Sequence, residues 1–233
     1  MSNDNSQDII DKYVKKYKNV KAFISLATKL NNAPKNAPKM GLVFGEPGLG
    51  KTNAILWWAI KQDALLITAK NGMSSRWFLT ELVTELGESP HYCTHILFEQ
   101  AIRHLLEHPR MLIIDEVDYL INSSKAIETI RDLHDRTGIP VLLVGMGMID
   151  KKLIRYKHLF DRIVEIYRFT PFDIDDVKEI VNTLSDVQIE NEVIEKLQQK
   201  ANRFRQIVKL ITKMENMAET NGYTKITNAE MGW

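Results

Sequence analysis

The sequence predicts an α/β fold in which a five-stranded parallel sheet is flanked by helices and followed by a small, all-helical subdomain at the carboxyl end. Five short apolar segments alternate with stretches in which apolar residues recur with the period of a helix. A glycine-rich loop lies between the first segment and the helix predicted after it. After residue 170 only the helical period remains. Strands that alternate with helices join through right-handed crossovers into parallel sheets. We therefore divide the chain into residues 1–39, 40–170 and 171–233.

The first 39 residues predict an amphipathic helix and a connector. Apolar residues recur three or four apart from Ile10 to Leu30, which favours a helix over residues 7–30, and Pro34 and Pro38 lie in the connector that follows. Residues 8–39 contain eight lysines and two aspartates. This basic charge fits either a solvated helix face or contact with a polyanion.

The middle of the chain alternates between predicted strands and predicted helices. The strand segments are short and rich in Ile, Leu and Val, as in strands buried on both faces. The predicted strands are residues 40–44, 64–68, 111–114, 140–144 and 163–169. The predicted helices between them are residues 52–61, 75–86, 95–107, 125–137 and 150–160.

The carboxyl-terminal region shows helical period alone. Asp173 or Asp175 is placed to cap a helix that ends near Leu184, because a side-chain oxygen at this position accepts from the first free backbone N–H groups. Two more helices are expected over residues 190–200 and 203–219, and Asn221-Gly222 ends the last of them. This region is therefore predicted to contain helices only.

The composition is that of a globular chain without a membrane-spanning segment. Of 233 residues, 44% are hydrophobic and 26% are charged, which excludes disordered and fibrous classes. The longest apolar run covers residues 54–60, whereas a helix needs about 20 such residues to cross a bilayer. The amino terminus lacks the apolar core of a secretion signal. Because Cys93 is the only cysteine, we expect a reducing, cytoplasmic setting and no membrane partner.

The glycine-rich loop matches the phosphate-binding pattern G-x-x-x-x-G-K-[ST]. Its backbone N–H groups and the helix N-terminus favour a β-phosphate, Lys51 reaches the β- and γ-phosphates, and the Thr52 hydroxyl is a ligand for Mg²⁺. The strand before the loop and the helix after it are the setting that this chemistry requires. The predicted nucleotide-contacting residues are Gly45, Glu46, Pro47, Gly48, Leu49, Gly50, Lys51, Thr52 and Asn53.

A second motif, Met-Leu-Ile-Ile-Asp115-Glu116, places two carboxylates at the end of an apolar strand. Asp115 is predicted to hold Mg²⁺, and Glu116 to polarise the water that attacks the γ-phosphate. Taken alone, the pair also fits the cap of the next helix, but beside a phosphate-binding loop the catalytic interpretation is favoured. Asp118 is interpreted as a cap or a support for the pair. No Asn-Lys-x-Asp tetrapeptide for guanine occurs, so ATP is the expected nucleotide.

Together the loop, the acidic pair and the helical tail resemble an AAA+ ATPase over about residues 20–230. The resemblance implies ATP hydrolysis with Mg²⁺ in a homo-oligomer whose sites lie between subunits. Arg162 matches the arginine finger, with Arg155 as the competing candidate, and Arg205 matches the lid arginine. A guanidinium from a neighbouring subunit neutralises charge on the transferring phosphoryl group. Met146 stands where this family has a polar sensor, which predicts slow or partner-stimulated hydrolysis.

Within that class the sequence is similar to the phage Mu B and TnsC-like family of transposition target selectors. The likeness lies in the compact lid and in residues 131–145 and 155–162. It implies binding to double-stranded DNA without sequence preference, a ring or helical filament of about six or more subunits per turn, and stimulation of hydrolysis by a transposase. The implied DNA-contacting residues are Lys70, Arg76 and Lys125, each of which also fits a solvated surface cation.

Two alternative functions remain open from the sequence. The first is a helicase loader or clamp-loader-like ATPase that acts on a replication protein. The second is a small-molecule kinase, which is disfavoured because no acceptor-binding subdomain is evident between the strands. A metal site is not expected, since the scattered histidines lack carboxylate or cysteine partners at metal-binding spacing. Those histidines are His91, His95, His104 and His108.

Overall fold

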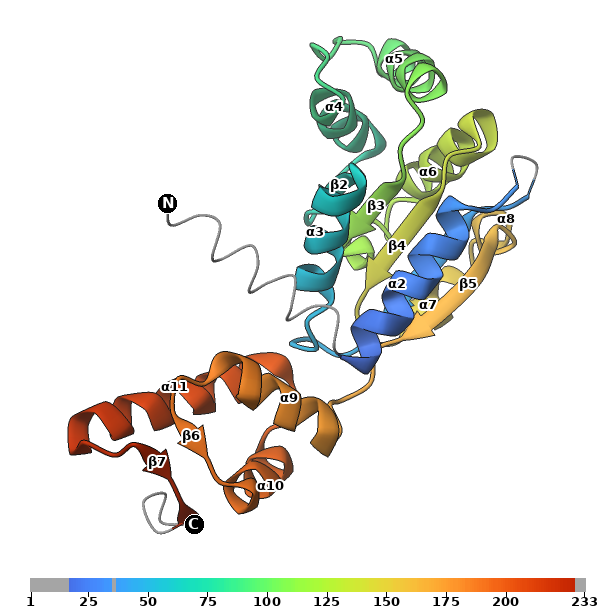
Figure 1. Ribbon diagram of the computed structural model, residues 1–233. Coiled ribbons are helices and arrows are strands. Elements are labelled where there is room, and N and C mark those ends of the chain that lie inside the picture. Colours follow the sequence, from blue (N-terminus) through green and yellow to red (C-terminus); the bar gives the residue numbers. More distant parts are fainter. Residues whose placement is uncertain (1–16, 35–36, 229–233) are drawn as a thin grey trace. The chain divides into compact units, whose positions relative to one another are not determined.

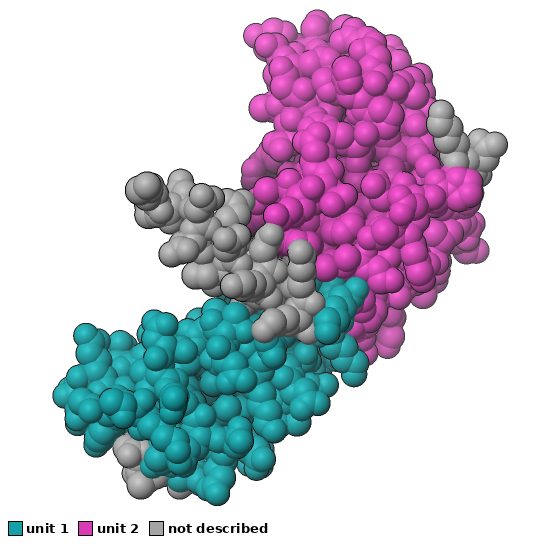
Figure 2. All heavy atoms as spheres, in the orientation of Figure 1, with its two compact units in different colours: residues 1–21, 46–51, 169–233 teal, residues 22–45, 52–168 magenta. Residues whose placement is uncertain are grey.

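The computed structural model describes residues 17–34 and 37–228 of the chain. The chain divides into two compact units, shown in teal and magenta in Figure 2. Unit 1 consists of Met1–Lys21, Glu46–Lys51 and Phe169–Trp233, and unit 2 consists of Ala22–Gly45 and Thr52–Arg168. The part of the predicted amino-terminal helix before residue 17 lies outside the described residues. Its described part is α2 (Lys18–Asn31).

Unit 2 contains a five-stranded parallel sheet, which confirms the predicted fold class. The strand order is β2-β3-β4-β1-β5 (Figure 1). Each strand starts and ends within one or two residues of its predicted position. The strands are β1 (Met40–Phe44), β2 (Leu65–Thr68), β3 (Leu112–Asp115), β4 (Val141–Gly145) and β5 (Ile163–Arg168).

Helices connect these strands, as the helical period predicts. One expectation is wrong: residues 150–160 form two short helices rather than one, because Tyr156 departs from helical geometry with φ −95° and ψ 68°. A short 3-10 helix, η1 (Val117–Tyr119), follows β3 directly. The remaining helices are α3 (Lys51–Gln62), α4 (Ser75–Glu85), α5 (Thr94–Glu107), α6 (Ser124–Thr137), α7 (Ile149–Leu153) and α8 (Lys157–Phe160).

The two faces of β1 pack against different helices. Met40, Leu42 and Phe44 belong to the large apolar core that residues of α4, α5, α6 and α7 complete. The opposite face is covered by α2: a Cβ added to Gly41 would lie 2.6 Å from Leu30 Cδ1. A side chain at this position would force Leu30 to move, so glycine favours this close approach of helix and strand. All five residues of β1 are therefore buried, as the apolar run predicts.

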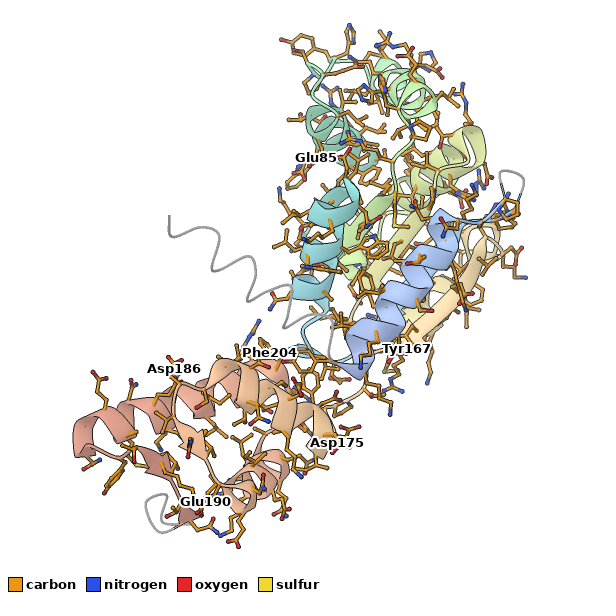
Figure 3. All side chains as sticks on the ribbon, in the orientation of Figure 1. Glu85, Tyr167, Asp175, Asp186, Glu190 and Phe204 are labelled. Carbon is orange, nitrogen blue, oxygen red and sulfur yellow. The ribbon has the colours of Figure 1, made fainter. Side chains whose placement is uncertain are left out.

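The described part of unit 1 is mainly helical. It contains α9 (Ile174–Leu184), α10 (Asn191–Lys200) and α11 (Phe204–Asn221). Asp173 caps α9, since its carboxylate accepts from Asp176 N at 2.9 Å. Phe204, labelled in Figure 3, meets the edge of Phe172 with ring centroids 6.5 Å apart.

The prediction of helices only in this region is wrong in one respect. Two short strands, β6 (Gln188–Ile189) and β7 (Lys225–Ile226), form a parallel pair within the helical region. Two-residue strands have no periodicity, so sequence patterning does not reveal them. None of the helices within the described residues is long and apolar enough to cross a membrane.

Candidate nucleotide-binding site

The glycine-rich loop runs from the end of β1 into the first turn of α3. Gly48 and Gly50 adopt φ values of 82° and 85°, which residues with a Cβ rarely adopt. The Lys51 ammonium turns back over the loop and donates to Glu46 O at 3.0 Å. Leu49 is buried, which anchors the loop. The backbone thus curls as the motif predicts, with the lysine side chain close to it.

At the end of β3 a carboxylate meets the first hydroxyl of α3. Thr52 Oγ1 donates to Asp115 Oδ2 at 3.0 Å, although the two residues lie 63 positions apart in the chain. Asp115 is only 4% exposed, and its Oδ1 accepts from Glu116 N at 2.9 Å. A hydroxyl and a buried carboxylate are the hard oxygen donors that Mg²⁺ prefers. These side chains therefore fit the predicted magnesium site.

Glu116, the predicted base, adopts an unusual backbone conformation. Its φ of 55° and ψ of 37° lie in the left-handed region, where a residue with a Cβ pays roughly 1–2 kcal/mol. This conformation turns the chain sharply from β3 into η1. Strain of this kind occurs at functional sites when the surrounding structure holds it in place.

Unit 1 brings the predicted lid arginine beside the glycine-rich loop. Arg205 N donates to Gly48 O at 3.4 Å. Arg203, which the sequence did not single out, lies 3.9 Å from a carboxylate oxygen of Glu46. A Cβ added to Gly48 would lie 3.7 Å from the Cβ atoms of both arginines. Arg203 and Arg205, at the start of α11, therefore lie next to residues 46–48.

The two finger candidates lie elsewhere in unit 2, and both have partners. Arg162 Nε and Nη2 donate to Asp135 at 3.1 and 2.8 Å, and this contact raises the pKa of the guanidinium. Arg155 donates to Ile121 O. Arg162 immediately precedes β5, whereas Asp115 ends β3. Because these strands are parallel within one sheet, Arg162 and Asp115 lie at opposite edges of it. A single chain therefore does not bring them together.

The residues predicted to contact DNA differ in how they are held. The Lys70 ammonium is 2.6 Å from a carboxylate oxygen of Glu81 and lies 5.7 Å from the centre of a Trp77 ring. Arg76 and Lys125 are exposed, and no residue in the described parts of the chain forms an ion pair with either side chain. Arg76 and Lys125 are therefore more available than Lys70 for contact with a DNA phosphate.

His91, His95, His104 and His108 lie in or next to α5. Across residues 17–34 and 37–228, no three His, Cys, Asp or Glu side chains are grouped so as to hold a metal ion. His104 contacts Glu88 at 3.3 Å, and His91 Nδ1 accepts from Cys93 N at 3.0 Å. Both contacts hold the turn between α4 and α5.

A phosphate-binding loop and an acidic strand end on a parallel sheet together define a P-loop nucleotide-binding fold. A family model described as an AAA domain matches residues 35–153. The chain belongs to this family. A relative from Staphylococcus aureus described as a potential ATP-binding protein is 21% identical, and the match covers 81% of this chain and 84% of that protein.

Solved structures of similar fold include two ORC proteins and a domain of a replication initiation protein. The Aeropyrum pernix ORC2 protein gives a TM-score of 0.69 at 16% identity, covering 92% of this chain and 66% of that one. The A. pernix ORC1 protein in complex with DNA gives 0.59 at 15% identity, covering 90% of this chain and 62% of that one. Domain III of Thermotoga maritima DnaA gives 0.61 at 16% identity, covering 95% of this chain and 92% of that one.

These similarities establish the fold. The chain spans about two thirds of the length of the two A. pernix proteins. The expected AAA+ class is confirmed, and the finer resemblance to Mu B and TnsC stays a prediction.

Proposed function

We propose that this chain binds ATP with Mg²⁺ and hydrolyses it. The observation that carries the proposal is the 3.0 Å hydrogen bond between Thr52 and Asp115, which joins the end of the phosphate-binding loop to the acidic strand end. The name of the S. aureus relative supports ATP as the nucleotide. Bound Mg²⁺ would neutralise charge on the β- and γ-phosphates.

Each residue of the proposed site has its own role in binding or hydrolysing ATP. The loop N–H groups and Lys51 bind and orient the phosphates. Glu116, placed one residue after the magnesium ligand Asp115, orients the attacking water and takes up its proton. Arg205, beside the loop at Gly48, contributes positive charge to the phosphates from the lid. Arg162 acts on the site of a neighbouring subunit, since its own sheet places it at the edge opposite Asp115.

We further propose that the ATP-bound chain assembles on double-stranded DNA and regulates transposition, with hydrolysis driving disassembly. The motif resemblance to Mu B and TnsC supports the transposition role, and the DNA-bound ORC1 neighbour supports the DNA-binding role. Arg76 and Lys125 are exposed cations available for phosphate contacts of this kind. Repetition around a ring or filament would bring several copies onto one duplex.

A second candidate is a loader or initiator that acts on a replication protein. It is favoured by the ORC2 and DnaA neighbours, whose fold covers more than nine tenths of this chain. The two candidates share the ATP site and differ in the protein partner.

The test is fluorescence anisotropy of labelled duplex DNA with ATP, a slowly hydrolysed analogue, or ADP, at several salt concentrations. We expect steep binding with the triphosphates only, weakening strongly as salt rises. The matched control is Lys51→Ala, which should bind no better with ATP than with ADP. Equal binding with and without nucleotide would contradict the proposal. Recovery of a replicative helicase rather than a transposase with the assembled protein would favour the second candidate.

A further inference from the structure

Asp118 links the end of β3 to the end of β4. It lies in η1, two residues after Glu116, and its side chain is only 15% exposed. Asp118 Oδ2 accepts from Met146 N at 2.6 Å. Lys152 on α7 places its ammonium 3.7 Å from the other carboxylate oxygen. Both partners lie after β4, so the carboxylate does not act as a cap for its own helix.

The contact leaves no room for a side chain at the end of β4. A Cβ added to Gly145 would lie 2.8 Å from Asp118 Oδ2, closer than such atoms approach in real structures. The same Cβ would meet Ile149 at 3.0 Å. The glycine therefore lets the backbone of β4 approach the carboxylate closely.

A second set of contacts ties the same two segments together. Ile121 O, beyond η1, accepts from Arg155 Nη2 and from the Tyr156 hydroxyl. The segment after β3 and the segment after β4 are thus joined at two places. Glu116 stands at the start of the first segment in its left-handed conformation, which requires its surroundings to hold it.

We propose that Asp118 is a positioning residue for ATP hydrolysis. It fixes the backbone of Gly145 and Met146 against the segment that carries Glu116, and so keeps the base aimed at the attacking water. Met146 has no polar side chain with which to contact a phosphate. In this chain the end of β4 is instead organised by a hydrogen bond to its backbone. The inference rests on the proposed ATPase function.

Two substitutions disturb this contact from opposite sides. Asp118→Ala removes the acceptor, and Gly145→Ala displaces the carboxylate from Met146 N without removing it from the chain. Because small displacements of a catalytic group cost up to ~100-fold in rate, we expect each to lower kcat at least about tenfold, with the KM for ATP within about threefold of wild type. Affinity for a fluorescent ATP analogue should not change.

Two further variants distinguish a positioning role of Asp118 from an effect of its charge or a loss of folding stability. Asp118→Asn keeps an oxygen that accepts from Met146 N, so its kcat should return to within about threefold of wild type. Lys152→Ala removes only a long, half-exposed ion pair and should have wild-type kcat. Melting temperatures of all four full-length variants report any loss of folding.

The results distinguish failure of the Asp118 inference from failure of the proposed ATPase function. If wild-type protein does not hydrolyse ATP with or without DNA, the proposed function fails and the inference fails with it. If wild-type protein does so and both Asp118→Ala and Gly145→Ala retain kcat, only the inference is wrong, even if these two variants melt at lower temperature. An Asp118→Asn variant as slow as Asp118→Ala would overturn it as well. If neither Asp118→Ala nor Gly145→Ala folds, the contact is purely structural and the inference is overturned.

Discussion

Arg162 and Asp135 form a bidentate ion pair, in which Nε and Nη2 of the guanidinium donate to the two carboxylate oxygens at 3.1 and 2.8 Å. The third nitrogen of Arg162 donates to His158 O at 2.8 Å. The guanidinium is therefore held on its own subunit, and action as a finger on a neighbouring subunit requires it to leave Asp135. Both side chains are about one-third exposed, and pairs of this exposure contribute only about 0.2–1 kcal/mol.

Asp135→Ala should raise DNA-stimulated ATP hydrolysis by about two- to fivefold, because breaking a pair worth under 1 kcal/mol makes Arg162 available to the neighbouring site. Steady-state rates with duplex DNA measure the effect. The matched control is Glu99→Ala, which removes the partner of Arg136, an exposed arginine next to Asp135 on α6. A rise of equal size in both variants would contradict the prediction.

Arg162→Ala should lower stimulated hydrolysis by a factor of about 10³ or more, the usual effect of losing an arginine finger. Mixing it with Lys51→Ala tests action between subunits. The first variant keeps an intact site and the second an intact arginine, so the mixture should regain part of the activity that each lacks alone. A mixture no more active than its components would show that Arg162 does not act across a subunit boundary.

Glu116→Gln should leave ATP binding within about twofold of wild type and lower kcat by about 10²-fold or more, because the amide does not take up the proton of the attacking water. DNA complexes formed with ATP should then outlast those of wild type. Nucleotide titration and the dissociation rate from labelled duplex measure the two effects. Hydrolysis at the wild-type rate would mean that another group is the base.

Thr52→Ala should weaken the binding of Mg²⁺ more than the binding of nucleotide itself. Its hydroxyl sits 3.0 Å from Asp115 Oδ2, so its loss removes one of the oxygens placed for the metal. We expect the Mg²⁺ concentration for half-maximal ATPase activity to rise about tenfold. Thr52→Ser keeps the hydroxyl and serves as the control, and a serine variant as impaired as the alanine variant would point to packing instead.

The buried His134 should make folding stability fall at acid pH. Burial lowers its pKa from the ordinary value of 6.5, and its Nδ1 donates to Ile139 O at 2.8 Å. The folded state therefore resists protonation more than the unfolded state does. Stability is fully present above pH 6.5 and is lost as pH falls below it toward the lowered pKa. Asp135 favours the charged form, whereas Arg162 and Lys39 oppose it.

Urea unfolding at pH 7.5 and pH 5.5 measures this effect. His134→Asn keeps a nitrogen able to donate to Ile139 O and does not titrate, so its stability should change less between the two pH values. A wild-type protein equally stable at both would contradict the prediction.

Much of the candidate site could be predicted because it is local in the chain. The loop 45–52 carries its own conformational requirement in Gly48 and Gly50. The sequence predicts Asp115 at the carboxyl end of its strand, where β3 does end. Parallel strands present their carboxyl ends at one edge of the sheet, so a motif after each of two strands meets there. The Thr52–Asp115 hydrogen bond is the outcome of that rule.

The pairings that the sequence did not reveal join residues far apart without a repeating pattern. Asp118 meets Met146 across 28 positions, and Arg162 meets Asp135 across 27. Arg203 was not singled out, although it lies beside Glu46. Hydrophobic period says which face of an element is buried, but it says nothing about which polar groups then face one another.

The sequence by itself determined the order of strands and helices, the parallel sheet and the phosphate-binding loop, because period, glycine and charge act over a few residues. Only the tertiary structure decided that Arg162 is bound by Asp135, that Asp118 holds the end of β4, and that β6 and β7 form a parallel pair within the helical region. The physical reason is that these contacts depend on how whole elements pack, and packing brings together groups that no local preference relates.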